Sequence, residues 1–447
     1  MNALSPRILL LNPPSRKPVF RDCYCSGPCK GTIFIHPLDL QIQSGFLIKG
    51  NYQVEFIDAV FERLHPSRAL QRIKAFDPDV ILSLVGKAYL EEDTAFLKQI
   101  KSCFPSARLF LTGDIARFHP ERLFQIIPEA DGLLMDFCSS GLLDYLQGRS
   151  SRDLLLPRGG AKNDIPADAT TDKHLEYPLP WKGFVRKYHY KLPFFSDPRY
   201  YSIASSFGCP YDCDYCNTHL LGYRNRRIED FIQELHFASA LGFKNLYIRD
   251  ATFMVEKDRA IRLFKEWEKA GLRFQWICFT RPDLIDEERV SLASRLGCRL
   301  MMLGVESFDE KCLKDMSRVV GPNGVRKAFR LLRSFGIGTA AEIMVGMRRI
   351  DDKAVSDYED RLKGFIKELD PDFVSLNVFS RRPGITATNP GLDHIESNEN
   401  IYKTMAARIN RNFYFHPKTL LRHLNTYMTP RELSNWLRIA LHLLVRR

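Results

Sequence analysis

Short runs of apolar residues alternate with helical patterns along the first third of the chain. Runs of this length are typical of strands that are buried on both faces of a parallel sheet. The predicted strands are 8–11, 54–60, 80–85, 107–112 and 132–135. Segments such as 66–76 and 91–104 carry apolar residues at helical spacing between them. This alternation predicts an α/β fold with a doubly wound parallel sheet over residues 1–150.

Residues 151–198 interrupt the pattern and are predicted to be a linker. They are rich in proline, with Pro157, Pro166, Pro178, Pro180, Pro193 and Pro198. Proline restricts its own backbone and lacks an N–H donor, so it disfavours both helix and central strand. Seven aromatic residues in the segment suggest that it nevertheless packs against another part of the chain.

A second series of strands and helices begins near residue 200. The predicted strands are 201–206, 245–249, 275–279, 299–304, 338–345 and 373–379, with helical patterns such as 229–241 and 258–269 between them. Six such repeats within residues 199–390 predict a partial (βα)6 barrel of the TIM type. The remaining residues, 391–447, are predicted to form a basic helical C-terminal region.

Composition narrows the class of protein. The chain has 447 residues, of which 45% are apolar, and this excludes a largely disordered protein and predicts two or three domains. No apolar run reaches the roughly 18–20 residues that a membrane-spanning helix needs, so we expect a cytoplasmic protein. The 11 cysteines, an odd number, favour a reducing compartment and metal ligation over a disulfide framework.

The net charge of +12 is concentrated at one end. Residues 403–447 contain nine Lys or Arg and one acid, Glu432, whereas the rest of the chain is nearly neutral. This distribution disfavours a nucleic-acid partner. Apolar residues at helical spacing from Leu433 to Leu444 favour docking on the chain's own barrel, and peripheral contact with a membrane surface through 410–447 is the alternative. The basic segment 410–422 is also a candidate for binding phosphates of a nucleotide-sugar or lipid-phosphate substrate.

Three cysteines follow the first predicted strand of the barrel. They form the run Cys209-Pro-Tyr-Asp-Cys213-Asp-Tyr-Cys216. Three thiolates in one loop can hold three irons of a four-iron cluster and leave the fourth iron open for catalysis. A zinc site, with His219 as a fourth ligand, is the alternative.

The cysteine run and six further stretches resemble radical SAM enzymes. Residues 200–385 resemble this superfamily throughout, specifically its branch with an N-terminal cobalamin (B12)-binding-like domain. The further stretches are Tyr247-Ile-Arg-Asp-Ala-Thr-Phe, Trp276-Ile-Cys-Phe-Thr-Arg, Leu296-Gly-Cys, Leu303-Gly-Val-Glu-Ser, Ile343-Met-Val-Gly and Arg382-Pro-Gly.

The resemblance implies a role for each matching residue. Cys209, Cys213 and Cys216 would hold a 4Fe–4S cluster, and its open iron would bind S-adenosylmethionine (SAM). The implied SAM contacts are Tyr215 near the adenine, Asp250 near the amino group, Arg281 near the carboxylate or ribose, Glu306 at the ribose or methionyl part, and Ile343 and Gly346 along the adenine.

The first domain matches the cobalamin-binding pattern only in part. Asn12-Pro-Pro after the first strand and Phe56-Ile-Asp58-Ala at the second resemble it, but the Asp-x-His-x-x-Gly loop that ligates cobalt has no match. We therefore expect no stoichiometric cobalamin. The segment Cys23-Tyr-Cys25-Ser-Gly-Pro-Cys29 is a candidate for a second metal site or a redox-active pair, and a thiol-rich loop without a ligand is the other interpretation.

The sequence thus predicts a radical SAM enzyme. We expect it to cleave SAM and abstract hydrogen from an unactivated carbon of a small or lipid-linked metabolite, leading to dehydration, epimerisation, oxidation or rearrangement. An external reductant of the flavodoxin or ferredoxin type would supply the electron. The main alternative is a cobalamin-dependent C-methyltransferase. A methylthiotransferase-like enzyme that modifies RNA and a non-catalytic iron–sulfur protein are further alternatives.

Overall fold

The chain folds as two compact units, Met1–Lys191 and Leu192–Arg447. The structure is a computed structural model, and it describes residues 5–24, 26–29, 33–157, 174–347, 354–380, 382–385 and 399–427. The finer division predicted at residues 150, 198 and 390 remains a proposal.

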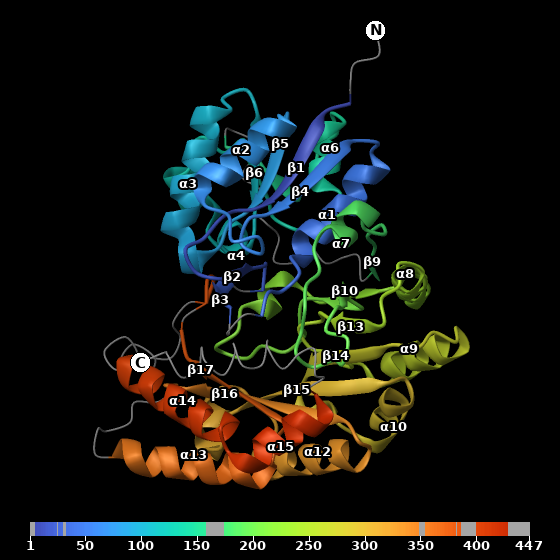
Figure 1. The fold of residues 1–447 in the computed structure, drawn as a ribbon, viewed down its shortest axis with the longest axis vertical. Helices are drawn as coiled ribbons and strands as arrows, with labels where there is room; N and C mark the ends of the chain where they lie inside the picture. The colour runs from blue at the N-terminus through green and yellow to red at the C-terminus, as the bar shows by residue number, and fades with distance from the viewer. Residues whose placement is uncertain are drawn as a thin grey trace. The chain divides into compact units, whose positions relative to one another are not determined.

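The first unit is built on a six-stranded sheet of order β4-β1-β5-β6-β7-β8 (Figure 1). Its strands are β1 (Arg7–Asn12), β4 (Gln53–Asp58), β5 (Val80–Leu84), β6 (Arg108–Thr112), β7 (Gly132–Leu134) and β8 (Leu154–Leu155). All pairs are parallel except β7 with β8. This confirms the predicted doubly wound sheet, and its switch point lies between the neighbouring strands β1 and β5.

Helices cover both faces of this sheet. Figure 1 shows α2 and α3 on one face and α1 and α6 on the other. The helices of the unit are α1 (Leu38–Lys49), α2 (Pro66–Phe76), the 3-10 turn η1 (Lys87–Tyr89), α3 (Leu90–Cys103), α4 (Asp114–Phe118), α5 (Pro120–Ile126), α6 (Gly141–Leu146) and α7 (Lys182–Lys187). Apolar side chains such as Ile73 and Leu97 pack from α2 and α3 onto Leu9 and Leu111 of the strands, forming a dry core.

A β-hairpin that the apolar pattern did not predict lies against loops at the carboxyl ends of this sheet. Its strands are β2 (Val19–Arg21) and β3 (Ser26–Pro28), and the two-residue strand β9 (His174–Leu175) comes later in the unit. Ser26 donates its hydroxyl and backbone N–H to Asp114 at 2.8 and 2.9 Å. Arg21 forms a buried ion pair with Asp93 at 2.5 Å. The hairpin is therefore hydrogen-bonded into the unit.

The aromatic residues of the predicted linker pack, as their number suggested. Phe184 stacks on Phe56 with ring centroids 3.9 Å apart, and Tyr190 packs on Phe61 at 4.7 Å. Tyr190 also donates its hydroxyl to the buried carboxylate of Asp58. These contacts bury the end of the first unit.

The second unit is built on a parallel sheet of order β10-β13-β14-β15-β16-β17. Its strands are β10 (Tyr201–Ile203), β13 (Asn245–Ile248), β14 (Gln275–Thr280), β15 (Cys298–Glu306), β16 (Gly338–Val345) and β17 (Phe373–Val378). A small antiparallel pair, β11 (Ser206–Phe207) with β12 (Arg224–Arg226), follows the first strand. Six parallel strands in chain order confirm the partial (βα)6 barrel.

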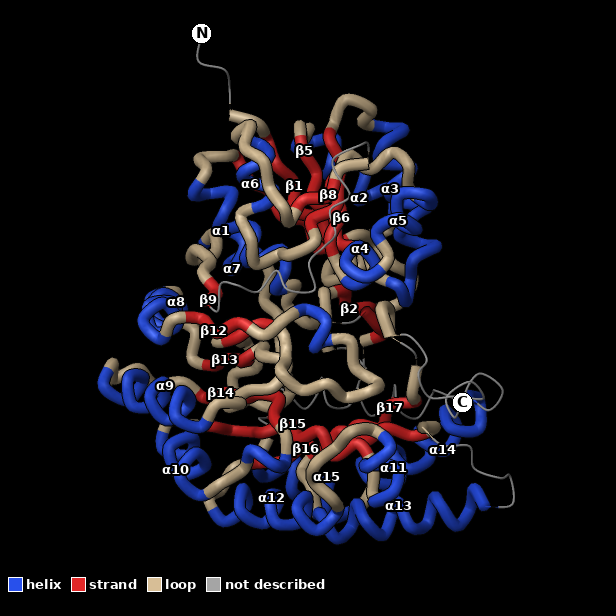
Figure 2. Tube along the Cα trace, turned by 180° about the vertical axis from the view of Figure 1, so that it is seen from behind, coloured by secondary structure: helices blue, strands red, loops and turns tan. Residues whose placement is uncertain are grey.

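Helices pack along the outer face of this sheet, as Figure 2 shows for α9, α10, α12 and α13. The helices are η2 (Thr218–Leu221), α8 (Ile228–Ala240), α9 (Lys257–Lys269), η3 (Pro282–Leu284), α10 (Glu287–Arg295), α11 (Glu310–Asp315), α12 (Pro322–Ser334), α13 (Val355–Leu369), α14 (Glu399–Tyr414) and α15 (Pro417–Thr426). Trp267 and Trp276 are fully buried between α9 and β14, with ring centroids 5.8 Å apart.

The described part of the C-terminal region docks on the barrel. The Tyr414 hydroxyl donates to the carbonyl oxygen of Val374 in β17 at 2.7 Å, and His423 stacks on Phe373. Arg422 pairs with Asp370 at 2.7 Å and Lys418 pairs with the same carboxylate at 3.1 Å. These two cations of the candidate phosphate-binding segment are therefore already paired.

The predicted apolar stripe from 433 to 444 lies outside the described residues. Within the part of the chain that was searched, no helix is long and apolar enough to cross a membrane.

Candidate active site

The carboxyl ends of the barrel strands bring the predicted site residues to one edge. All six strands are parallel, so the residues that follow each strand lie at the same edge of the sheet. Arg281 follows β14, Glu306 ends β15 and Gly346 follows β16. The three-cysteine loop reaches this edge from β10 and β11, because Cys213, Tyr215 and Cys216 pack with Met344 and Met347 at the end of β16.

The three thiols of the loop lie in different surroundings. Cys213 is buried, whereas Cys209 and Cys216 are partly exposed. The sulfur of Cys209 lies 3.5 Å from the Thr252 hydroxyl, and that of Cys216 lies 3.2 Å from the Thr218 hydroxyl. Burial raises the pKa of the Cys209 thiol. A bound metal cluster would reverse this preference, because metal ligation favours the thiolate.

The turn that begins the loop depends on glycine. Gly208 has a φ of 76°, and a Cβ at this position would lie 1.4 Å from the carbonyl oxygen of Gly222. A residue with a side chain would have to push the two segments apart. Gly208 therefore sets the path by which the chain enters at Cys209.

Arg281 lies between an acid, an aromatic ring and a thiol. Its Nε and Nη2 donate to the two oxygens of Asp283 at 2.9 and 3.0 Å, and its guanidinium lies 3.7 Å from the ring centroid of Tyr211. The remaining nitrogen, Nη1, lies 3.6 Å from the sulfur of Cys213. The sequence predicts a SAM contact here; the structure places the side chain against the cysteine loop.

Glu306, Tyr215 and Arg318 form a second charged group beside the loop. The Tyr215 hydroxyl donates to Oε1 of Glu306 at 2.9 Å, and Arg318 donates to the carbonyl oxygen of Gly304 at 2.6 Å. Burial raises the pKa of the Glu306 carboxyl, and the neighbouring Arg318 and the Tyr215 hydrogen bond oppose this shift. Glu306 has a φ of 62°, a left-handed conformation that is rare for a residue with a side chain and costs about 1–3 kcal/mol.

Sequence reasoning missed Arg318. Its Nη1 lies 3.9 Å from the Cys213 sulfur, on a loop after α11. The nearby Tyr215 and Glu306 raise the pKa of its guanidinium, although burial acts in the other direction. A single arginine beyond a short helix carries no local signal, and only the folded chain shows its neighbours.

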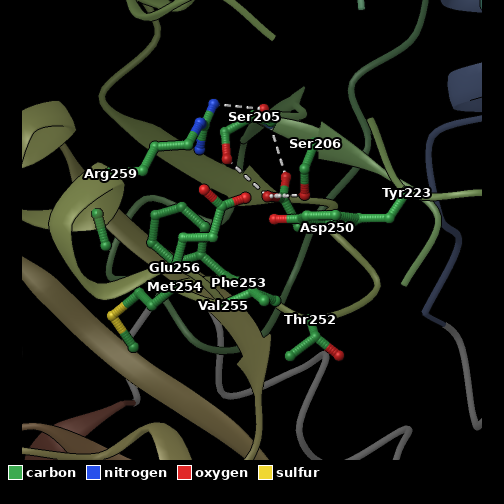
Figure 3. Close-up of a pocket in the computed structure, with 11 residues that line it drawn as sticks. Ser205, Ser206, Tyr223, Asp250, Thr252, Phe253, Met254, Val255, Glu256 and Arg259 are labelled. Carbon is green, nitrogen blue, oxygen red and sulfur yellow. Dashed lines mark hydrogen bonds between the residues drawn. The ribbon is translucent and has the colours of Figure 1, made fainter. Parts of the chain in front are cut away.

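Asp250 lies beneath the start of the loop. Its carboxylate accepts hydrogen bonds from the backbone N–H and hydroxyl of Ser205, each at 2.6 Å, and from the hydroxyl of Ser206 at 2.7 Å (Figure 3). These residues line a small polar pocket with Tyr223, Thr252, Glu256 and Arg259, among others. Burial raises the pKa of Asp250, and the serine hydrogen bonds lower it. In this position the side chain joins the ends of β10 and β13.

Ile343 and Gly346 belong to the end of β16. Ile343 is buried, with 1% of its surface exposed. Gly346 has a φ of 87°, and a Cβ there would come within 3.1 Å of the Tyr402 ring of α14. The glycine thus allows α14 to pack closely, whatever else it contacts.

In the described part of the chain, no three His, Cys, Asp or Glu side chains converge closely enough to hold one metal ion. Two polar atoms beside the loop, Oδ1 of Asn217 and Nδ1 of His219, are buried and lack a partner among the described residues. These two atoms could therefore form hydrogen bonds with a further polar group bound at the site.

The second cysteine segment lies in the first unit. Cys23 and Cys29 are each 4% exposed, and Cys25 lies outside the described residues. Burial raises the pKa of Cys29 to about 12 and also raises that of Cys23. As at Cys209, metal ligation would instead favour the thiolate.

A family model matches the part of the second unit that carries the three-cysteine loop. Residues 203–362 match the sequence model of the radical SAM superfamily. The chain thus carries a radical SAM domain that follows a doubly wound N-terminal unit in the sequence.

Two cobalamin-containing radical SAM enzymes share the fold of this chain. TsrM from Kitasatospora setae, with cobalamin and a [4Fe-4S] cluster bound, has a TM-score of 0.62 and 18% identity, with 86% of this chain and 77% of that chain covered. OxsB, with aqua-cobalamin bound, has a TM-score of 0.58 and 15% identity, covering 90% and 56%. Residues 203–362 therefore form a radical SAM domain, and the chain as a whole shares the fold of these two enzymes.

Curated relatives carry out several reactions. An uncharacterized methyltransferase, PH0819 of Pyrococcus horikoshii, is 23% identical over 85% of this chain and 81% of its own length. The hopanoid C-3 methylase of Methylococcus capsulatus is 23% identical over 78% and 67%. The anaerobic magnesium-protoporphyrin IX monomethyl ester cyclase of Synechocystis is 25% identical over 84% and 75%.

Proposed function

We propose that Cys209, Cys213 and Cys216 hold a 4Fe–4S cluster at which SAM is bound and reductively cleaved. The observation that carries this is the position of the loop, at the edge of a parallel barrel where active sites form, inside the matched radical SAM domain. When bound, the cluster supplies one electron to SAM, received from an external reductant. The chain's own residues then bind and orient SAM and keep water out.

Glu306 is the proposed partner of the SAM ribose. A carboxylate bonds a ribose hydroxyl more strongly than a neutral acceptor does, by about twofold. The Tyr215 hydroxyl, at 2.9 Å, fixes one carboxylate oxygen and leaves the other available. Arg318, close to Glu306, favours the charged form that this role needs. Ile343 would give the adenine an apolar wall; for Gly346, close packing against Tyr402 is a sufficient structural reason.

The proposed reaction is methylation of a carbon atom in a small or lipid-linked metabolite. A methyltransferase and a hopanoid methylase are among the relatives that align with most of this chain, and TsrM is a radical SAM methyltransferase. Radical chemistry suits a carbon without an acidic proton, which ordinary acid–base groups cannot activate. This replaces hydrogen abstraction without methyl transfer as the leading reaction.

Cobalamin-dependent methylation is the form that TsrM and OxsB favour, since both are solved with cobalamin. In a doubly wound unit the ligand lies at the carboxyl ends of the strands. In this structure Asp114, Asp93 and the Gly86 backbone at those ends are hydrogen-bonded to the hairpin or to one another. A corrin bound directly against these groups would have to displace the hairpin.

A second candidate is oxidative or rearranging chemistry without methyl transfer. The cyclase relative, which aligns with 84% of this chain, favours it. The two candidates differ in whether the product gains a methyl group from SAM.

The test uses anaerobically reconstituted protein with methyl-deuterated SAM, dithionite and a metabolite extract, with and without hydroxocobalamin. We expect about four irons per chain, SAM consumption, and a product carrying the deuterated methyl group. The triple variant Cys209→Ala, Cys213→Ala, Cys216→Ala should lose iron and SAM cleavage, whereas Cys278→Ala, a buried cysteine elsewhere in the barrel, should keep both. Full iron in the triple variant contradicts the cluster assignment. A product without deuterium supports the second candidate.

A further inference from the structure

Two arginines approach the same sulfur from different parts of the barrel. Nη1 of Arg281, after β14, lies 3.6 Å from the Cys213 sulfur, and Nη1 of Arg318, after α11, lies 3.9 Å from it. Cys213 is the middle thiol of the loop and its most buried one, with 5% exposed. Both contacts join residues that are distant in the sequence, so they form only when the second unit is folded.

Arg281 is held rigidly in this position. Asp283 binds two of its nitrogens, and the Tyr211 ring, from the loop between Cys209 and Cys213, stacks against its guanidinium. Only 4% of the residue is exposed. An arginine held by a bidentate carboxylate and an aromatic face has little freedom, so its remaining N–H groups point in a fixed direction.

Arg318 is held by a different partner. Its Nη2 donates to the carbonyl oxygen of Gly304 at 2.6 Å, which leaves Nη1 directed at the sulfur. The site thus has two independently fixed guanidiniums at one thiol. A third, Arg382, lies with Nη1 4.0 Å from the Cys216 sulfur.

We propose that Arg281 and Arg318 are positioning residues for the cluster: they donate hydrogen bonds to the Cys213 thiolate and make the cluster easier to reduce. The proposal rests on the proposed cluster at Cys209, Cys213 and Cys216. Reduction adds one electron, and hydrogen bonds and positive charge near a ligating sulfur stabilise the more negative state. The two arginines therefore raise the reduction potential.

The predicted SAM contact of Arg281 gives a different expectation. An arginine that only bound the SAM carboxylate would change SAM affinity and leave the potential of the SAM-free cluster unchanged. An arginine that only stabilised the fold would change the unfolding temperature and also leave the potential unchanged. The potential measured without SAM separates the three roles.

The experiment is a redox titration of the SAM-free cluster, followed by electron paramagnetic resonance, on full-length reconstituted protein. The variants are Arg281→Gln, Arg281→Lys and Arg318→Gln, and the control is Arg295→Gln, which removes an exposed arginine paired with Glu268. We expect each Gln variant to lower the equilibrium constant for reduction about tenfold, or about 59 mV for one electron. The reduction potential of Arg281→Lys should lie between those of wild type and Arg281→Gln, and the potential of the control should match that of wild type.

The outcomes separate this inference from the proposed function. Wild-type protein that binds no cluster contradicts the proposed function itself. A cluster that forms in both Gln variants with an unchanged potential overturns the role of the arginines and leaves the proposed function standing. Loss of iron from Arg281→Gln with retention in Arg281→Lys supports the positioning role, because Lys keeps the positive charge beside the Cys213 sulfur that Gln lacks. The reduction potential is then measured on Arg318→Gln.

Discussion

The carboxylate of Asp250 accepts two hydrogen bonds from Ser205, one from its backbone N–H and one from its hydroxyl, each at 2.6 Å. Ser205 lies just after β10, and Asp250 lies just after β13. The contact therefore joins two neighbouring strand ends below the residues that lead to Cys209. Both residues are buried, with 2% of Asp250 and 1% of Ser205 exposed.

Replacing Asp250 with Ala should destabilise the second unit. The change leaves buried donors on Ser205 and Ser206 without their acceptor, and each such loss costs about 1–3 kcal/mol. We expect a loss of about 2–4 kcal/mol in the free energy of unfolding, measured by denaturant titration. Asp250→Asn keeps one acceptor oxygen, so its free energy of unfolding should fall less. Exposed Asp258→Asn is the control, and an Asp250→Ala variant as stable as wild type with weakened SAM binding would instead support the predicted SAM contact.

Two glycines with similar backbone angles give a matched test of the cysteine loop. A Cβ at Gly208 (φ 76°) would collide with the carbonyl oxygen of Gly222, whereas a Cβ at Gly242 (φ 82°) would meet open space within 4 Å. Gly242→Ala should lower the free energy of unfolding only by the strain of a left-handed alanine, about 1–2 kcal/mol, and the variant protein should keep the wild-type iron content. Gly208→Ala should cost more and lower iron binding, because the loop must move. Equal stability and iron content in the two variants would show that Gly208 does not fix the loop.

The neutral form of Glu306 should favour stability of the fold, whereas the charged form should favour SAM binding. Burial raises the pKa of its carboxyl above the usual value of 4.5, so the native state binds the proton more tightly than the unfolded state does. Stability from this group is present below pH 4.5 and is lost as the pH rises through the raised pKa. Glu306→Gln stays neutral, so it should be more stable than wild type at about pH 7 and should lose the fall in stability that wild type shows as the carboxyl ionises.

The same variant should bind SAM more weakly. Loss of a charged acceptor costs about 1.5–3 kcal/mol, or at least tenfold in affinity, measured by anaerobic calorimetry. Iron content should stay at the wild-type level. Exposed Glu266→Gln, on α9, is the control for one lost carboxylate. Unchanged SAM affinity in Glu306→Gln would show that another residue holds the ribose.

The positions of the parallel strands could be predicted from the sequence, whereas the contacts of the site could not. Buried parallel strands such as β5 (Val80–Leu84) are continuous apolar runs, and this local signal marked the parallel strands of both sheets. The two-residue antiparallel strand β8 (Leu154–Leu155) was missed, because it lies in the segment predicted to be a linker. The Cys213 contact with Arg318 joins residues 105 positions apart, and no local pattern marks it. The hairpin of β2 and β3 was missed because its strands are only three residues long and its stabilising partners, Asp93 and Asp114, are distant in sequence.

The last prediction concerns cobalamin and the hairpin of the first unit. The Ser26 hydroxyl donates to Asp114 at 2.8 Å and accepts from the Ala88 N–H at 3.0 Å. Ser26→Ala removes both bonds, and a loss of about 1–2 kcal/mol raises the fraction of molecules with an open hairpin roughly 5- to 30-fold. If cobalamin binds at these strand ends, Ser26→Ala should load hydroxocobalamin faster than wild type. Ser67→Ala, an exposed residue at the start of α2, is the control.

Absorbance of the desalted protein measures the loading, and amide hydrogen exchange at residues 26, 27 and 86–88 measures the opening. We expect these amides to be protected in the cobalamin-free protein, because the Ala88 N–H is bonded to Ser26 and the Ser26 N–H to Asp114. Loading should remove the protection of the Ser26 and Ala88 amides if the corrin takes the place of the hairpin at these strand ends. Wild-type protein that takes up one cobalamin per chain with the hairpin still protected would show that the corrin binds elsewhere.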